Sequence, residues 1–150
     1  MKKLFLSLFL ILLVSTSAFG EIKKQTHDNG DYYIGEVSSN NQRHGYGIYY
    51  TDNGHIQKAL WNYNEKVSGS YLWPNGNKFI GKFGYSWYGK FFWTDGSSKF
   101  QKLINNKWGR SNYSESNAHY LQGIKDSKQA NVKVNQYKNK KKFITKKTKK

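Results

Sequence analysis

The residue types best suited to catalysis, histidines and carboxylates, are scattered along this chain. The histidines are His27, His44, His55 and His119. They show no metal-ligand spacing, and the sequence contains no nucleophile elbow, phosphate loop or zinc signature. Asp28, Asp52 and Asp95 fall in expected turns, where their side chains cap the local backbone. The sequence therefore predicts a protein that is not an enzyme and has no cofactor and no metal.

Aromatic side chains offer a second kind of chemistry, which is binding by stacking. The segment GYSWYG at 84–89 holds Tyr85, Trp87 and Tyr88, and so short a loop cannot bury all three rings. Exposed rings stack on the faces of sugars, so these three residues predict a glycan- or cell-wall-binding module as an alternative function. A platform for nucleic acid needs rings interleaved with cations. Here the rings and the lysines lie in different parts of the chain, so nucleic acid is not an expected partner.

The lysines are concentrated at the C-terminus. Residues 125–150 hold eleven lysines and one acid, in a chain of net charge +16. Blocks of like charge tend to stay disordered and to serve as interaction arms, and each lysine near an anionic bilayer contributes ~1 kcal/mol. We therefore expect a disordered tail that docks the protein on anionic lipid, a wall polymer or an acidic protein; a purely solubilising tail is the alternative. The residues assigned to docking are Lys138, Lys140, Lys141, Lys142, Phe143, Lys146, Lys147, Lys149 and Lys150.

The first twenty residues have the pattern of a secretory signal peptide. Two lysines precede an apolar stretch at 4–14, and small residues stand at Ala18 and Gly20. Eleven apolar residues are too few to span a hydrocarbon core of ~30 Å. We therefore expect an exported protein, periplasmic or extracellular, with peripheral membrane association and no transmembrane helix in the mature chain. It has no cysteine, so packing has to stabilise it without disulfides.

Four turn pairs recur along the middle of the chain. They are Asn29-Gly30, Asn53-Gly54, Asn75-Gly76 and Asp95-Gly96, spaced by 24, 22 and 20 residues. Such pairs between alternating apolar residues are strong hairpin signals. Since the spacing shrinks by two each time, every side chain keeps its face of the sheet. The pattern predicts a row of four antiparallel hairpins, with Pro74 and Gly76 forming a type I turn and its left-handed residue.

Large rings alternate with small residues in these strands, as in Tyr33-x-Gly35 and Phe79-x-Gly81. We expect one ring-bearing core face, on which the glycines admit a ring from the neighbouring strand, and a second face that is partly solvated. The repeat-defining glycines are Gly35, Gly47, Gly54, Gly69, Gly76, Gly81, Gly89 and Gly96.

The pattern Tyr33-x-Gly35 … Gly45-x-Gly47 … Gly54 resembles the MORN repeat. The resemblance covers roughly 30–115, with three recognisable copies and a degenerate fourth. It implies an all-β fold, an elongated and twisted stack of antiparallel hairpins, and association with membranes or proteins. It assigns lipid binding to no particular residue.

The expected organisation has four parts: a signal peptide at 1–20, a MORN-like β-repeat domain at 21–116, a short capping helix at 117–124, and the disordered lysine-rich tail at 125–150. The oligomeric state is left open by the sequence.

Overall fold

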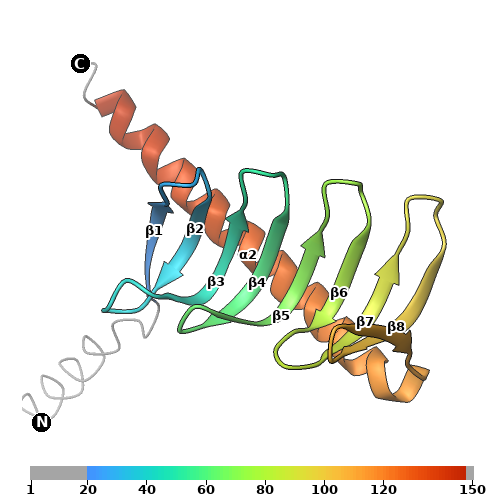
Figure 1. The fold of residues 1–150 in the computed structure, drawn as a ribbon. Helices are drawn as coiled ribbons and strands as arrows, with labels where there is room; N and C mark the ends of the chain where they lie inside the picture. The colour runs from blue at the N-terminus through green and yellow to red at the C-terminus, as the bar shows by residue number, and fades with distance from the viewer. Residues whose placement is uncertain (1–19, 148–150) are drawn as a thin grey trace, which may run out of the picture.

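A computed structural model describes residues 20–147 of the chain. The predicted signal peptide, apart from Gly20, and two docking residues, Lys149 and Lys150, lie outside this range. The described residues form one antiparallel sheet whose strands follow the order of the sequence, with one long helix across it (Figure 1). The elements are β1 (Glu21–Thr26), β2 (Tyr32–Val37), β3 (Arg43–Tyr50), β4 (Ile56–Asn62), β5 (Glu65–Leu72), β6 (Lys78–Lys82), β7 (Trp87–Phe92), β8 (Ser98–Ile104), β9 (Lys107–Arg110) and α2 (Tyr113–Lys147). The predicted row of β-hairpins is confirmed.

The four predicted turns share one geometry. Each turn glycine has a positive φ, between 86° and 89°, which a side chain would oppose. At the third turn, the Gly76 amide donates to the Trp73 carbonyl and the Trp73 amide donates to the Asn77 carbonyl, both at 2.9 Å. The role predicted for Pro74 and Gly76 is therefore confirmed.

Side chains that follow the turn glycines tie successive hairpins together. Asp31 accepts hydrogen bonds from the Asp52 amide at 2.9 Å and the Tyr49 hydroxyl at 2.7 Å, and these two donors lower the pKa of its carboxyl. Asn77 accepts one from the Thr94 amide at 3.2 Å in the same way. In the hairpin between these two, the position equivalent to Asp52 and Thr94 is Pro74, which has no N–H group to donate. The turns are thus linked wherever the backbone can donate.

One face of the sheet is packed by its own aromatic rings. The ring of Tyr33 is fully buried and lies over Gly35 and Gly47, where any Cβ atom would overlap it. Its hydroxyl donates to the Glu36 carbonyl at 2.9 Å. At Gly47 the ring comes from the neighbouring strand β2, as the sequence predicts, whereas at Gly35 the same ring lies over a glycine of its own strand. Farther along, Phe79 is also fully buried.

The other face is covered by helix α2, which runs diagonally over the strands (Figure 1). Ile34 and Ile48 pack against Ala130 and Val134 of the helix. At Gly123 the helix approaches so closely that a Cβ atom would lie 2.6 Å from the Gly81 amide nitrogen. This face is therefore buried over much of its area, in contrast to the partly solvated face that the sequence predicts.

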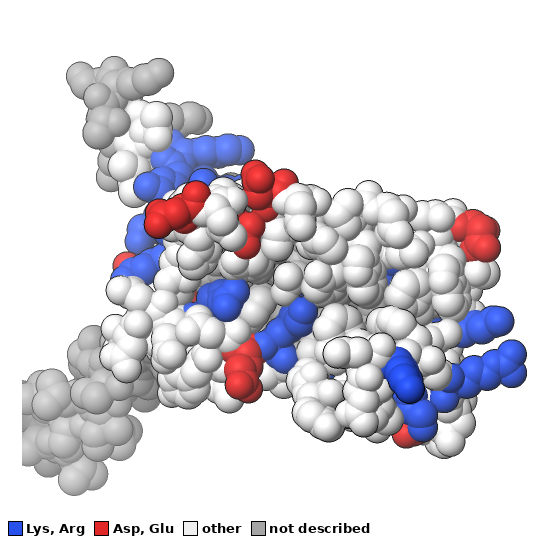
Figure 2. Space-filling view, in the orientation of Figure 1, with Lys and Arg blue, Asp and Glu red and all other residues white. Residues whose placement is uncertain are grey.

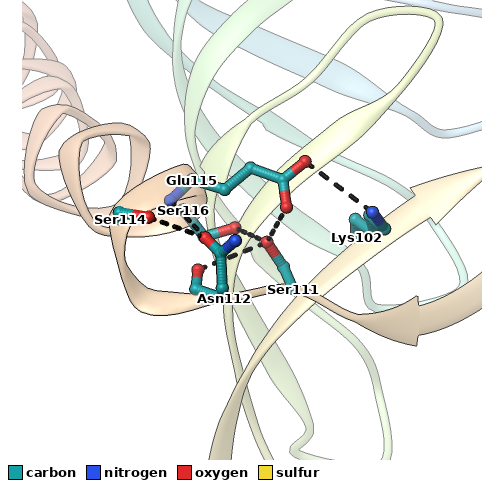
Figure 3. A network of polar contacts seen from close by, with 6 residues as sticks. All are labelled: Lys102, Ser111, Asn112, Ser114, Glu115 and Ser116. Carbon is teal, nitrogen blue, oxygen red and sulfur yellow. Dashed lines mark hydrogen bonds and ion pairs between the residues drawn. The ribbon is translucent and has the colours of Figure 1, made fainter.

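The helix begins at a side-chain cap that the capping-helix prediction missed (Figure 3). The Asn112 side-chain oxygen accepts a hydrogen bond from the Glu115 amide at 2.6 Å. Glu115 in turn accepts from the Ser111 hydroxyl at 3.0 Å and lies 3.7 Å from the Lys102 ammonium. An asparagine cap with a glutamate three residues later is a strong helix start, so the helix begins before the predicted residue 117.

Helix α2 continues to Lys147, which corrects the expectation of a disordered tail for residues 125–147. Its sheet-facing side repeats every seven residues, at Ser116, Gly123, Ala130 and Tyr137. These residues are mostly small, so the segment carries little of the apolar signal by which a helix is recognised. The helix is therefore stabilised mainly by its contact with the sheet, which its amino-acid composition does not predict.

Candidate functional site

The lysine-rich end of helix α2 extends past strand β1 at the edge of the sheet (Figures 1 and 2). Lys138, Lys140, Lys141 and Lys142 are all exposed on it. Because successive helical residues are rotated by about 100°, Lys138, Lys141 and Lys142 share one side of the helix and Lys140 lies on the opposite side. We call residues 138–147 the basic helix end. The structure thus brings the predicted docking residues within its range onto one rigid element.

Two apolar side chains stand among these lysines. Phe143 is 71% exposed and Ile144 is 52% exposed. Large apolar side chains left in water on a cationic helix are suited to insertion at an interface between water and lipid. Phe143, the more exposed of the two, can add an apolar contact to the electrostatic one.

A cleft of about 310 Å³ separates the basic helix end from strand β1. Its apolar wall includes Ile22 and Tyr137, and its rim includes Lys24 and Lys140. The Lys24 ammonium lies 4.7 Å from the ring centroid of Tyr32. Strand β1 therefore places Lys24 at the same corner of the molecule, while its Lys23 pairs with Glu21 at 3.2 Å.

Buried polar contacts fix the helix on the sheet. Glu36, only 3% exposed, pairs with the Lys133 ammonium at 2.8 Å. Its other carboxylate oxygen accepts a hydrogen bond from the Tyr46 amide at 2.7 Å. Because an unpaired buried charge is costly, this pair selects one position of the helix relative to β2 and β3.

A second buried carboxylate, Asp126, joins helix α2 to strand β5. Its oxygens accept hydrogen bonds from the Ser68 hydroxyl and, at 2.9 Å, from the Gln122 side chain. Burial raises the pKa of the Tyr46 hydroxyl, and the charge of Asp126 raises it further. The helix is thus held to β3 and β5 by specific polar partners.

The aromatic face contains cations of its own. The Arg43 guanidinium lies 4.5 Å from the Trp61 ring centroid and 4.7 Å from that of Tyr49. In the next hairpin the Lys66 ammonium lies 4.4 Å from the centroids of both Tyr71 and Phe83. These cation–ring contacts stabilise the aromatic face in the first two repeats.

Lys66 is the most strongly perturbed cation of this row. Its ammonium group also donates to the Gln57 side-chain oxygen at 3.0 Å. Burial, together with the charge of Arg43, lowers the pKa of Lys66 to about 7. The side chain therefore changes charge near neutral pH inside a packed ring cluster.

The three residues predicted for glycan binding are not brought together. Tyr85 is 89% exposed and its hydroxyl donates to Asn105 at 3.0 Å. Trp87 packs into the aromatic row, with its ring centroid 4.7 Å from that of Phe83. Tyr88 lies against His119 of helix α2, on the other face. Alternation along β7 separates Trp87 from Tyr88.

The structure shows a different ring-lined groove, at the last strands of the sheet. It has a volume of about 410 Å³. The sequence contained one signal for it, the Asn105-Asn106 turn before Trp108, which extends the strand alternation by one further ring. The residues that line this terminal groove are Phe91, Trp93, Gln101, Trp108, Gly109 and Arg110.

Each histidine packs against a tyrosine ring. The pairs are His27–Tyr49, His44–Tyr63, His55–Tyr71 and His119–Tyr88. Within residues 20–147 no group of three or more His, Cys, Asp or Glu side chains is placed to hold a metal ion. In the same range, no helix has the length and apolar character needed to cross a membrane.

These features define a repeat protein of stacked β-hairpins with ring-packed strands. The family model of the MORN repeat matches residues 33–56 and 61–78, and the chain therefore contains MORN repeats. Such repeats generally serve membrane association and scaffolding. The same hairpin geometry continues beyond the matched residues, through β7 and β8. No curated protein matches the chain.

Proposed function

We propose that this is an exported, non-enzymatic repeat protein that docks on an anionic envelope surface through its basic helix end. The observation that carries the proposal is the exposure of Lys138, Lys140, Lys141 and Lys142 on one helix at the edge of the sheet, beside strand β1. Export is supported by the signal-peptide pattern at 1–20. Anionic lipid headgroups are the proposed surface.

The charge supports docking of moderate strength. Lysines near an anionic surface contribute ~1 kcal/mol each, so the three that share one side of the helix, Lys138, Lys141 and Lys142, supply about 3 kcal/mol. Such binding is weakened by salt, because the interaction falls off within a Debye length of about 8 Å at physiological ionic strength. Phe143 adds an apolar contribution that salt does not screen.

Helical order of the lysines also supports docking. A disordered segment loses conformational entropy when it is held at a surface, whereas the lysines of α2 are already fixed relative to one another. The Glu36–Lys133 pair lies about one and a half turns before Lys138 and holds the helix on the sheet. Docking would therefore orient the whole sheet relative to the surface.

The test is sedimentation with vesicles that contain 30% phosphatidylglycerol in phosphatidylcholine, at low and high salt. The protein should sediment with the anionic vesicles at low salt, and exchange of Lys138, Lys140, Lys141 and Lys142 for Gln should abolish this. A matched control exchanges Lys99, Lys107, Lys125 and Lys128, which are exposed elsewhere, and should retain binding. Equal loss in both variants would show that net charge alone is responsible and would contradict the proposal.

Wall polymer and an acidic partner protein are the other anionic surfaces. Binding to purified cell-wall polymer, with no binding to the anionic vesicles, would replace the lipid surface by the polymer. Binding to neither would remove the basic helix end as a docking element.

A further inference from the structure

The terminal groove lies where the repeating aromatic row ends. In the preceding hairpin, the ring of Trp73 is covered by Phe91 of the next hairpin, with centroids 5.3 Å apart. Trp93 occupies the same place one repeat later. Within the described residues it is followed by the short strand β9, whose Trp108 packs on Phe91 at 5.3 Å. The groove is thus the place where a further ring would continue the row.

Two indoles and a phenyl ring form the apolar walls of this groove. Trp108 is 41% exposed, although it also contacts Phe79 and Trp87 with ring centroids 5.5 and 6.0 Å apart. Its inner edge is therefore anchored in the core while its outer part stays open. A flat ligand in the groove would lie against Trp93 and Trp108, which both line it.

Polar groups complete the groove on one side. Gln101 and Arg110 are paired across β8 and β9, and both line the groove. Gln101 stands in the row occupied by Gly35, Ala59 and Gly81 in the earlier repeats, so the last repeat replaces a small residue by an amide. The groove combines ring faces with a planar amide and a guanidinium, which donate and accept hydrogen bonds.

These groups select among possible occupants. A cationic ligand is disfavoured, because Arg110 lies at the groove and its lining contains no carboxylate. A second copy of the chain is disfavoured because the open edge strands carry Lys107 and Arg110 on β9 and Lys23 and Lys24 on β1, and like charges oppose pairing of these edges. A sugar ring fits both features, since its C–H face packs on indole and its hydroxyls bond to amide and guanidinium groups.

We propose that the terminal groove binds one pyranose unit of a glycan, with Trp93 and Trp108 stacking on the ring and with Gln101 and Arg110 bonding to its hydroxyls. The volume of about 410 Å³ lies within the usual range for small-ligand sites. This site is separate from the basic helix end, at the opposite end of the strand order. It replaces the predicted set of Tyr85, Trp87 and Tyr88 as the aromatic glycan site.

The experiment is a titration of the mature chain with two uncharged probes, the β-1,4-linked trimers of glucose and of N-acetylglucosamine. Binding is followed by tryptophan fluorescence and by calorimetry. At least one trimer should bind with a Kd in the millimolar range or tighter and change the tryptophan emission. Exchange of Trp108 for Ala should weaken binding at least tenfold, and Arg110→Gln should weaken it severalfold with an unchanged melting temperature. Tyr85→Ala, at an exposed ring outside the groove, should bind as the parent does.

Several results would overturn the proposal. They are the absence of binding to both trimers, binding that survives in both groove variants, and preferential binding of choline over the sugars. Reversible dimerisation that is lost in Trp108→Ala would assign the groove to a second copy instead. The Arg110→Gln variant should still sediment with anionic vesicles, so failure at this groove is distinguishable from failure of lipid docking. If Trp108→Ala does not fold, Arg110→Gln and Gln101→Ala carry the test.

Discussion

The two faces of the sheet are buried by different means. The aromatic face is filled by residues that recur every repeat, so Tyr33 and Phe79 occupy equivalent strand positions and are both fully buried. The opposite face is covered by one helix whose partners occur once each, such as Lys133 for Glu36 and Asp126 for Ser68. The first face is encoded locally and repeatedly, whereas the second depends on single contacts between residues far apart in the chain.

The largest effect is expected on the aromatic face, from Phe79→Ala. Phe79 is fully buried and its ring contacts Phe83, Trp87 and Trp108. Loss of a buried phenyl ring should lower the free energy of unfolding by about 3–5 kcal/mol, measured by urea denaturation. Phe143→Ala removes an exposed ring and should change it by less than about 0.5 kcal/mol. If both variants lost a similar free energy of unfolding, the aromatic rings would not be the main core.

The helix-covered face should be nearly as sensitive to Lys133→Met. This variant leaves the Glu36 carboxylate buried without its cation, which should cost about 3 kcal/mol. Adding Glu36→Gln should recover much of the loss, as a double-mutant cycle in urea would show. If both single variants are neutral and additive, the pair does not fix the helix.

A smaller effect is expected from Gly123→Ala in helix α2. In an exposed helix this change would stabilise by about 1 kcal/mol. Here the new Cβ atom would meet the Gly81 backbone, and overpacking costs about 1–3 kcal/mol. The melting temperature should fall and amide exchange in α2 should accelerate, whereas Gln129→Ala on the exposed side should change neither. A raised melting temperature would mean that the helix does not contact the sheet at Gly123.

The last prediction concerns the pH dependence of stability that Lys66, the titrating cation of the aromatic face, should produce. Its pKa is lowered to about 7 in the folded protein, from an ordinary value of 10.5. Between these values the unfolded chain holds a proton that the folded protein does not, so stability should rise with pH across this window. Urea denaturation at pH 7 and pH 9 should show the rise, and Lys66→Met should remove its contribution. An identical pH dependence in parent and variant would contradict this origin.

Much of the aromatic face is predictable from the sequence, because its signals are local. Asn75-Gly76 fixes a turn by backbone conformation, and the two-residue alternation assigns Trp61 and Phe83 to the same face. The terminal groove was only partly predictable. The Asn105-Asn106 turn indicates a further strand, but the separation of Trp93 from Trp108 depends on how the last strands pack.

The sequence by itself determined the row of hairpins, their phase and the ring-bearing face, since turn chemistry and strand alternation act over a few residues. Only the tertiary structure decided that residues 113–147 form one helix on the opposite face. Its sheet-facing residues have a short apolar pattern only at Ala130, Val134 and Tyr137, whereas Gly123 and Asp126 are small or polar. Their stabilising value arises from the fit of Gly123 to the sheet backbone and of Asp126 to Ser68, and these partners come together only when the sheet has formed.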